Sequence, residues 1–275
     1  MNNIQYLLQI DDLHKYKVHA ARWNQEANPL DVFLTDREAW HCWNAFFNGR
    51  HDFNRPYIIS LMDFYHERDA WLFGGIYRVL NHASKPASEL AGTHAYDVEL
   101  MDTGADMIGR LKVKLDLSKV RQVRLNAERY VDRMELIEVL RSPYSGPGFA
   151  GYDQASLNWS DLVSIVRNDR ADWKTALRHM KGVYVITFAD GRNYVGSAYG
   201  DVGLWSRWSA YATSRHGGNI EMRKLHEATD GAFIEDARFT LVEAWPTRTE
   251  DRHIIKRESY WKDALMSRKT GVNRN

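Results

Sequence analysis

The chain is poor in cysteine, in long apolar runs and in excess charge of either sign. Cys42 is the only cysteine among 275 residues, so neither a disulfide framework nor a thiolate metal cluster can be built within one chain. No apolar run approaches the roughly 20 residues that cross a bilayer, and the first residues lack the basic and apolar regions of a signal peptide. The formal net charge is +1. We therefore expect a cytoplasmic protein with no membrane association, in which charge alone does not indicate a nucleic-acid partner.

Proline is also scarce, and it is unevenly placed. Two of the six prolines fall, with several glycines, in SPYSGPGFAGYD at residues 142–153, which predicts a linker. Before it, residues 1–141 hold many short β-type runs and one helical pattern at 35–49, with Thr35 as its N-cap and Glu38 at the capping-box position. The strand patterns lie at 16–23, 31–35, 55–65, 70–80, 95–102, 109–116 and 134–141. This predicts a β-rich, barrel-like N-terminal domain.

The segment after the linker, residues 154–275, has a different pattern. Two leading helices are followed by a β-hairpin at 181–200, two more helices, a strand at 237–245 and a long helix from about 250 to 269 that Gly271 ends. This order predicts a compact α+β unit. The fold class of the whole chain is therefore α+β, with two domains.

The hairpin KGVYVITFADGRNYVG carries two tyrosines, Tyr184 and Tyr194. A two-residue Asp190-Gly191 turn would place them on opposite faces, whereas a three-residue loop with Gly191 in the left-handed region would place them on the same face. The sequence leaves both turns open.

The long helix carries one carboxylate on an otherwise apolar stripe. Residues spaced three or four apart share one face of this helix, and these are Ile254, Ile255, Glu258, Trp261 and Leu265. Such a carboxylate is costly to bury unless it is paired or binds a cation.

Further polar residues could converge on the same pocket. Arg207 and Tyr211 lie four residues apart on one helix face, and Asn273 follows the end of the long helix. Together with Glu258 and the hairpin tyrosines, they suit phosphodiester cleavage, which needs a base for water, a cation for the phosphorane and a ligand for a hard metal ion.

In these residues the segment 181–275 resembles the GIY-YIG nuclease family. The matching positions, in order, are Gly182-Val183-Tyr184, Tyr194-Val195-Gly196, Arg207, Tyr211, Glu258 and Asn273. The family normally has isoleucine where Val183 and Val195 stand, an apolar change that removes no functional group. The triplets alone are a weak signal, and the whole ordered set is a strong one.

The resemblance implies a Mg²⁺-dependent endonuclease, with Mn²⁺ as a substitute. Tyr184, assisted by Tyr194, would be the general base, and its pKa, about 10 when unperturbed, would have to be lowered by Arg207 and the metal. Arg207 would stabilise the pentavalent phosphate and Glu258 would hold the metal ion. Asn273 would either order this region or simply cap the helix end.

The expected partner is DNA, and cutting both strands would need a homodimer or two successive nicks. A basic stretch between Arg252 and Arg274 offers Lys262 and Arg268 as phosphate contacts, with His216 in the SRHGGN turn as a third. The alternative for all three is an ordinary solvated surface.

A literal triplet also occurs in the N-terminal part, as Gly75-Ile76-Tyr77. It has no second triplet within a hairpin's length, and no arginine or glutamate helix follows at family spacing. We interpret Tyr77 as a strand tyrosine beside a glycine bulge.

In the N-terminal domain the run AWLFGGIYRV at 70–79 is followed by AYDVELMD at 95–102. In these runs the domain weakly resembles PUA-like and EVE-like modified-base readers. The aromatic residues that could form a base pocket are Trp23, Trp40, Trp43, Tyr65 and Trp71, although most aromatics of a domain belong to its core. The resulting hypothesis is a restriction or defence nuclease that its N-terminal domain directs to modified DNA. The alternatives are a nucleic-acid-binding protein with a vestigial nuclease fold, and a nuclease for RNA or branched repair intermediates.

Overall fold

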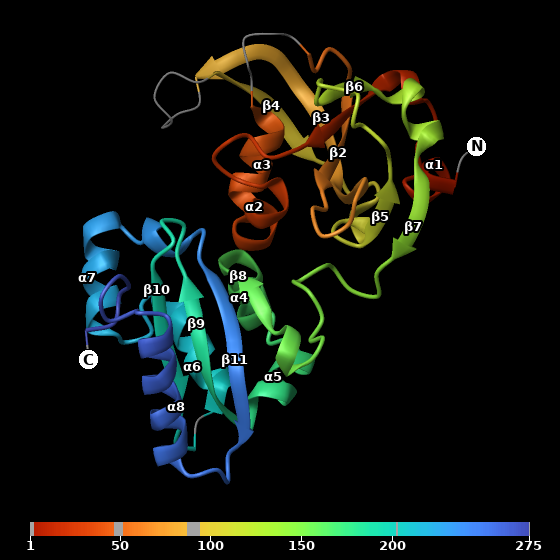
Figure 1. Ribbon diagram of the computed structural model, residues 1–275. Coiled ribbons are helices and arrows are strands. Elements are labelled where there is room, and N and C mark those ends of the chain that lie inside the picture. Colours follow the sequence, from red (N-terminus) through yellow and green to blue (C-terminus); the bar gives the residue numbers. More distant parts are fainter. Residues whose placement is uncertain (1–2, 47–51, 87–93, 202, 275) are drawn as a thin grey trace. The chain divides into compact units, whose positions relative to one another are not determined.

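The computed structural model describes residues 3–46, 52–86, 94–201 and 203–274. Contacts divide the chain into two compact units, Met1–Tyr144 and Ser145–Asn275 (Figure 1). Each unit combines a β-sheet with helices, so the predicted α+β class holds. None of the helices in the described ranges has the length and hydropathy that a bilayer span requires.

The sheet of the first unit is open in the described residues. Its strands run in the order β6-β1-β2-β3-β5-β7, and β4 also pairs with β3. The outermost strands, β6 and β7, do not pair with one another there, so the predicted barrel-like closure is not seen. The strands are β1 (Tyr16–Ala21), β2 (Tyr57–Asp63), β3 (Ala70–Pro86), β4 (His94–Leu100), β5 (Leu111–Lys114), β6 (Arg124–Asn126) and β7 (Glu135–Val139).

Two helices join the one parallel strand pair of this sheet. Because β1 and β2 run parallel, the chain must cross over between them, and it does so through α2 (Pro29–Thr35) and α3 (Arg37–Ala45). The strand predicted at 31–35 is wrong: Pro29 stands in the first helical turn, where its missing N–H costs nothing. The predicted N-cap is also wrong, since Asp36, not Thr35, accepts from the backbone N–H groups of Glu38 and Ala39.

The aromatic residues of this unit do not form one group. Trp40 and Trp71 belong to two different hydrophobic clusters of the core, whereas Trp23 is 61% exposed. Each of the two buried indoles donates to a backbone carbonyl, Trp40 to Gly74 and Trp71 to Leu115. Their place in the core is what the base rate for large aromatics predicts.

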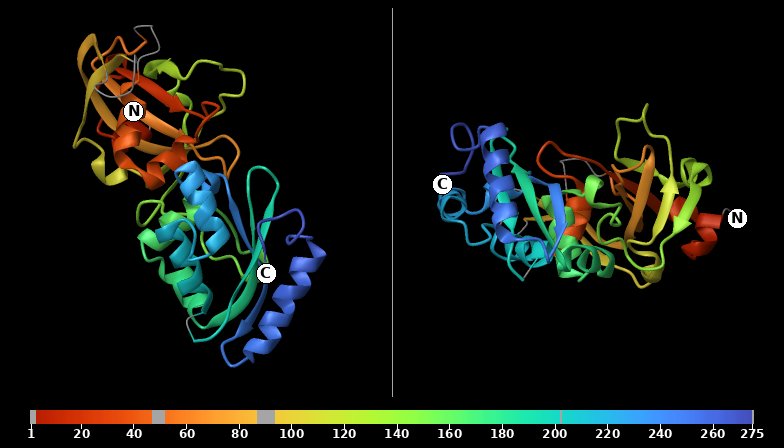
Figure 2. Two further views of the ribbon diagram at one scale, coloured as in Figure 1. Left: turned by 90° about the vertical axis from the view of Figure 1, so that its left-hand side faces the viewer. Right: turned by 60° about the horizontal axis from the view of Figure 1, so that its bottom comes forward.

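The second unit is a four-stranded antiparallel sheet between two layers of helices. The strands follow the order β10-β9-β11-β8. Helices α4, α5 and α6 cover one face, and α8 lies along the other (Figure 2, left). The elements are β8 (Ser156–Asn158), α4 (Trp159–Arg167), α5 (Ala171–Arg178), β9 (Met180–Thr187), β10 (Asn193–Ala198), α6 (Gly203–Ser214), α7 (Ile220–Thr229), β11 (Arg238–Pro246) and α8 (Asp251–Ala264).

The turn between β9 and β10 answers the question that the sequence left open. Phe188 donates its N–H to the carbonyl of Arg192, which leaves three loop residues, 189–191, and Gly191 has φ of 82°. The loop is therefore the three-residue type with a left-handed glycine. Tyr184 pairs with Gly196 and Tyr194 with Ile186, so both tyrosines project from the same face of the hairpin.

Helix α8 is shorter than the pattern predicts. It ends at Ala264, not near Lys269, and turns follow it. Ile254 is fully buried, and Trp261 packs with it against the sheet, but Ile255 is 44% exposed and leaves the predicted apolar stripe. A stripe at positions i, i+4, i+7 and i+11 contains Ile254 and Glu258, and Ile255 lies about 100° away from it.

Most of the predicted linker is packed into the second unit. Trp173 donates its indole N–H to the carbonyl of Pro147, and its ring meets the Phe149 ring at 5.0 Å. The Phe149 N–H bonds to the Asp172 carboxylate. These contacts attach residues 147–149, near the start of the second unit, to the N-terminal half of α5.

Candidate active site

The two triplets of the hairpin fit together through a tyrosine and a glycine. Tyr184 is fully buried and lies across Gly196 on the neighbouring strand. A Cβ atom at residue 196 would lie 2.5 Å from the Tyr184 hydroxyl oxygen. The glycine of the second triplet is therefore required by the tyrosine of the first.

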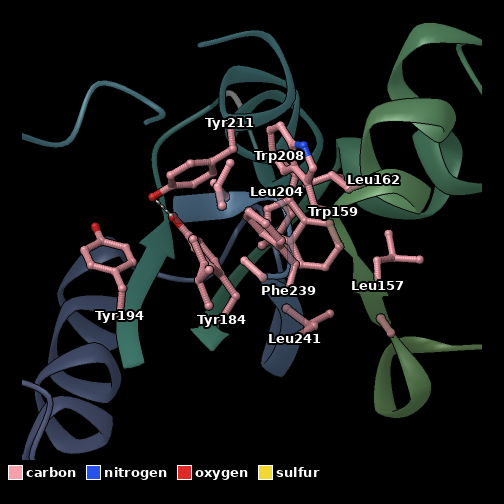
Figure 3. Close-up of a cluster of buried hydrophobic side chains, with 14 of the residues drawn as sticks. Leu157, Trp159, Leu162, Tyr184, Tyr194, Leu204, Trp208, Tyr211, Phe239 and Leu241 are labelled. Carbon is pink, nitrogen blue, oxygen red and sulfur yellow. Dashed lines mark hydrogen bonds between the residues drawn. The ribbon is translucent and has the colours of Figure 1, made fainter. Parts of the chain in front are cut away.

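Arg207 on α6 connects the tyrosine hydroxyls. Its Nε donates to the Tyr184 hydroxyl at 2.9 Å, its Nη2 to the Tyr211 hydroxyl at 3.1 Å and its Nη1 to the Gly217 carbonyl at 2.7 Å. The Tyr184 and Tyr211 hydroxyls are themselves 3.1 Å apart (Figure 3). Three of the five guanidinium N–H groups are thus engaged in orienting the side chain, which leaves two for a ligand.

Burial decides the protonation of the inner tyrosines. It raises the pKa of Tyr184, the neighbouring Tyr194 raises it further, and Arg207 and Tyr211 oppose this only in part. The pKa of Tyr211 is also raised, mainly by burial and then by Tyr184. We expected Arg207 to bring the pKa of Tyr184 below its ordinary value, but the protein's side chains together raise it. Tyr184 and Tyr211 therefore act as neutral hydrogen-bonding partners.

A pocket of about 740 Å³ opens beside this network. Tyr194, Arg207 and Glu258 line it, from β10, α6 and α8, whereas Tyr184, Tyr211 and Asn273 do not. The Tyr194 hydroxyl accepts from the side-chain amide of Asn219 at 3.3 Å. Of the six predicted catalytic residues, three therefore border the space where a substrate fits, and three lie behind them.

Glu258 is held between a hydroxyl and an ammonium group. One carboxylate oxygen accepts from Ser197 Oγ at 2.7 Å, and the other lies 3.0 Å from Lys262 Nζ. The Glu258 side chain is 15% exposed and that of Lys262 is 6% exposed. These two contacts offset the cost of burying most of a carboxylate on an apolar stripe.

Asn273 binds the backbone of β10 rather than the pocket. Its side-chain oxygen accepts from the Val195 N–H at 2.8 Å, and its amide donates to the Val195 carbonyl at 2.9 Å. Val272 donates to the carbonyl of Asn193 in the same way. Of the two roles considered for Asn273, ordering the region matches the structure, because its amide satisfies the outer edge of β10.

The structure gives the three predicted DNA contacts other surroundings. Lys262 is buried against Glu258, and Arg268 forms an ion pair with Asp263 at 2.5 Å. His216 accepts from the backbone N–H of Gly218 within its own turn. None of the three is among the residues that line the pocket. Four of the seven basic residues between Arg252 and Arg274 pair with acidic side chains, and Arg274 lines the pocket.

The donor set of the pocket fits a hard divalent cation. Among the described residues no three His, Cys, Asp or Glu side chains come together as a metal cluster. Glu258 is joined in the pocket by the Glu221 carboxylate and by hydroxyl, amide and phenol oxygens. One carboxylate completed by waters and phosphate oxygens is a usual Mg²⁺ site, whereas structural zinc takes four nitrogen or sulfur ligands. Glu258 is the residue that would hold such an ion.

Sequence reasoning missed Ser197 and Asn219, which fix Glu258 and Tyr194. Ser197 directly follows the second triplet. Asn219 is the N-cap of α7, where it accepts from the Met222 N–H. The sequence shows that Ser197 follows a triplet and that Asn219 follows a Gly-Gly pair. The side chains to which they bind depend on the fold.

No protein-family model, curated protein or solved structure matches this chain.

Proposed function

We propose that the second unit hydrolyses phosphodiester bonds in DNA with Mg²⁺, as the resemblance to GIY-YIG nucleases implies. The observation that carries this proposal is the convergence of Tyr194, Arg207 and Glu258, from a strand and two helices, on one pocket. A phenol, a cation and a carboxylate supply the three kinds of group that the reaction needs.

Arg207 is the group for transition-state charge. Its guanidinium is fixed by Tyr184, Tyr211 and the Gly217 carbonyl, so it needs no reorganisation when charge develops on the phosphate. Its remaining N–H groups bind the non-bridging oxygens. Tyr184 and Tyr211 act through Arg207 as positioning residues.

Tyr194 is better placed than Tyr184 to handle the attacking water. Its hydroxyl reaches the pocket and accepts from Asn219, whereas Tyr184 is enclosed and its pKa is raised by burial. Water attacks phosphorus as the bond to the leaving alcohol oxygen breaks. Tyr194 orients the water through a hydrogen bond, the proton of the water passes to solvent, and the leaving oxygen takes a proton from solvent. This assignment replaces Tyr184 as the group in contact with the nucleophile.

Glu258 would hold the Mg²⁺ ion, and Mn²⁺ has the same ligand preferences. When bound, the ion supplies positive charge at the scissile phosphate and the leaving oxygen. Ser197 fixes the orientation of the carboxylate through its hydrogen bond.

The first unit keeps its proposed role as the part that selects the DNA, in a restriction or defence setting. The proposed catalytic residues lie in the second unit, and ion pairs occupy four of the seven basic residues of its C-terminal stretch. Sequence-blind phosphate contacts do not give selection. Parallel cleavage of unmodified and cytosine-modified phage DNA tests this role.

The deciding experiment is a cleavage assay of the full chain with Mg²⁺, with Mn²⁺ and with chelator, alongside Glu258→Gln. Glutamine keeps the size of the side chain and removes the charge that attracts a divalent cation, so we expect strand scission to fall by at least about 10²-fold. The matched control is Glu221→Gln, which changes the other carboxylate lining the pocket and should leave at least half of the rate.

Two results contradict the proposal. One is a wild-type chain that cuts neither DNA nor RNA in any of these metals. The other is an active wild-type chain whose Glu258→Gln and Glu221→Gln variants lose activity equally.

A further inference from the structure

The exposed rim of the pocket carries two large apolar side chains together with Ser206 and Arg274, whereas the less exposed Arg207 and Glu258 form its floor. Tyr199 is 46% exposed and Ile220 is 68% exposed, and both line the pocket. The other large hydrophobic side chains exposed on the described part of this unit do not line it; they are Tyr152, Ile255, Tyr260 and Met266. The two apolar rim residues therefore mark the pocket rather than the surface in general.

Neighbouring hydrogen bonds hold both rim residues in place. Gly200, next to Tyr199, donates its N–H to Asp251 at 3.1 Å, and Asp251 is paired with Lys181. Ile220 is the first residue of α7, directly after its N-cap Asn219, which also binds Tyr194. Hydrogen bonds of the neighbouring residues thus fix the backbone at Tyr199 and at Ile220, so both side chains stay exposed at the pocket.

A polar floor below a rim that carries two large apolar side chains and the cationic Arg274 matches a nucleotide chain at a phosphate. The phosphate fits the arginine and the metal-binding carboxylate on the floor, and the bases on its two sides are the apolar parts that meet the rim. Aromatic side chains stack on bases, and an exposed aliphatic side chain covers a base face or enters a base step. In a continuous duplex the base faces are covered by their neighbours, so such contacts require bases that have left the stack.

We propose that Tyr199 and Ile220 bind unstacked bases beside the scissile phosphate, so that this site prefers DNA with unpaired nucleotides at the point of cleavage. This inference rests on the proposed phosphodiesterase function and narrows its substrate. Tyr199 is the stacking platform, and Ile220 covers the base on the other side.

Binding can be measured without cleavage. The full chain is titrated in chelator with two oligonucleotides of one sequence, a complete duplex and a duplex with a short unpaired bubble carrying 2-aminopurine. We expect at least about tenfold tighter binding of the bubble and a change in 2-aminopurine fluorescence on binding. Tyr199→Ala should lose about tenfold in affinity for the bubble and little for the duplex, whereas Tyr199→Phe should keep its affinity because the ring remains.

The matched control for Tyr199→Ala is Tyr260→Ala, and the matched control for Ile220→Ala is Ile255→Ala. Both controls remove an exposed side chain of the same type from α8. Equal affinity for bubble and duplex overturns the inference, as does a Tyr199→Ala variant that binds like Tyr260→Ala. Cleavage in Mg²⁺ is measured separately. Efficient cutting of both DNAs at equal rates ends the inference and leaves the nuclease function standing, whereas the function itself ends only if modified phage DNA and RNA are not cut either.

Discussion

Two strands of this protein carry a glycine two residues before a buried tyrosine, Tyr77 on β3 and Tyr184 on β9. Burial raises the pKa of both, to about 12 for Tyr77. The hydroxyls differ in what they meet. The Tyr77 hydroxyl lies near Asn44, which lowers its pKa only in part, whereas the Tyr184 hydroxyl accepts from Arg207, which borders the pocket. A tyrosine triplet therefore acquires a chemical role only from the residues that surround its hydroxyl.

The largest expected effect separates these two tyrosines. Tyr184→Phe deletes the hydroxyl that fixes Arg207 Nε and should lower the cleavage rate by about 10²-fold or more. Tyr77→Phe deletes an equivalent hydroxyl and should stay within about twofold of wild type. Single-turnover cleavage of one DNA substrate measures both, and equal losses would mean that β3 contributes to the active centre.

The second prediction concerns the buried polar network around Asn44 in the first unit. His19 donates to the Asn44 side-chain oxygen at 2.9 Å, and its pKa is lowered to about 4, first by burial and also by Arg124, although the bond to Asn44 opposes this. The unfolded chain takes up the proton near pH 6.5, so it binds more protons than the folded chain between these values. Stability is complete above pH 6.5 and falls as the pH drops towards 4, by about 2 kcal/mol at pH 5.

Hydrogen exchange of the β1 peptide from pH 7 to 5 measures this loss. His19→Gln, which cannot be protonated, should have a flatter pH dependence, and His14→Gln, at an exposed site, should behave like wild type. A pH dependence of wild-type strength in His19→Gln would assign the effect to another group.

A smaller effect is expected where the second unit depends on Asn273. Asn273→Ala leaves the N–H and carbonyl of Val195 unpaired at a buried position and should cost about 1–2 kcal/mol. Faster hydrogen exchange of residues 193–198 is the readout. Asn168→Ala, which removes a bond within α4, should leave that exchange unchanged.

The smallest effect is expected at Lys262. Lys262→Met removes the ammonium group that lies 3.0 Å from Glu258. Because this positive charge repels an incoming cation, the variant should bind metal about fivefold more tightly. Terbium luminescence titration measures this without any cleavage. Lys224→Met, beside the second pocket carboxylate Glu221, is the control. Weaker binding by Lys262→Met would show that the lysine holds Glu258 in place for the metal.

The sequence predicts the local elements of the second unit better than those of the first. The hairpin, the helices and the position of Glu258 follow from apolar spacing and turn residues. The run 31–35, DVFLT, misleads because a short apolar run with β-branched and aromatic residues suits a strand, while Pro29 and the need for a crossover impose a helix. The pairing of β6 with β1 joins residues that are far apart in the chain, and no local pattern predicts it.

The candidate site shows the same limit. Residue types and spacing single out Arg207, Tyr194 and Glu258. That Tyr184 is enclosed, that Lys262 faces Glu258 and that Ser197 and Asn219 support the pocket all depend on how separate elements pack. Burial determines the pKa of Tyr184, and burial is set by the whole unit.

The covered edge of β10 has a consequence for solubility. β10 is the outer strand of its sheet, and Val272 and Asn273 engage backbone groups of Asn193 and Val195 along it. An uncovered strand edge recruits strands from other molecules and promotes aggregation. The segment that orders the second triplet thus also shields the protein from strand-to-strand association with its own copies.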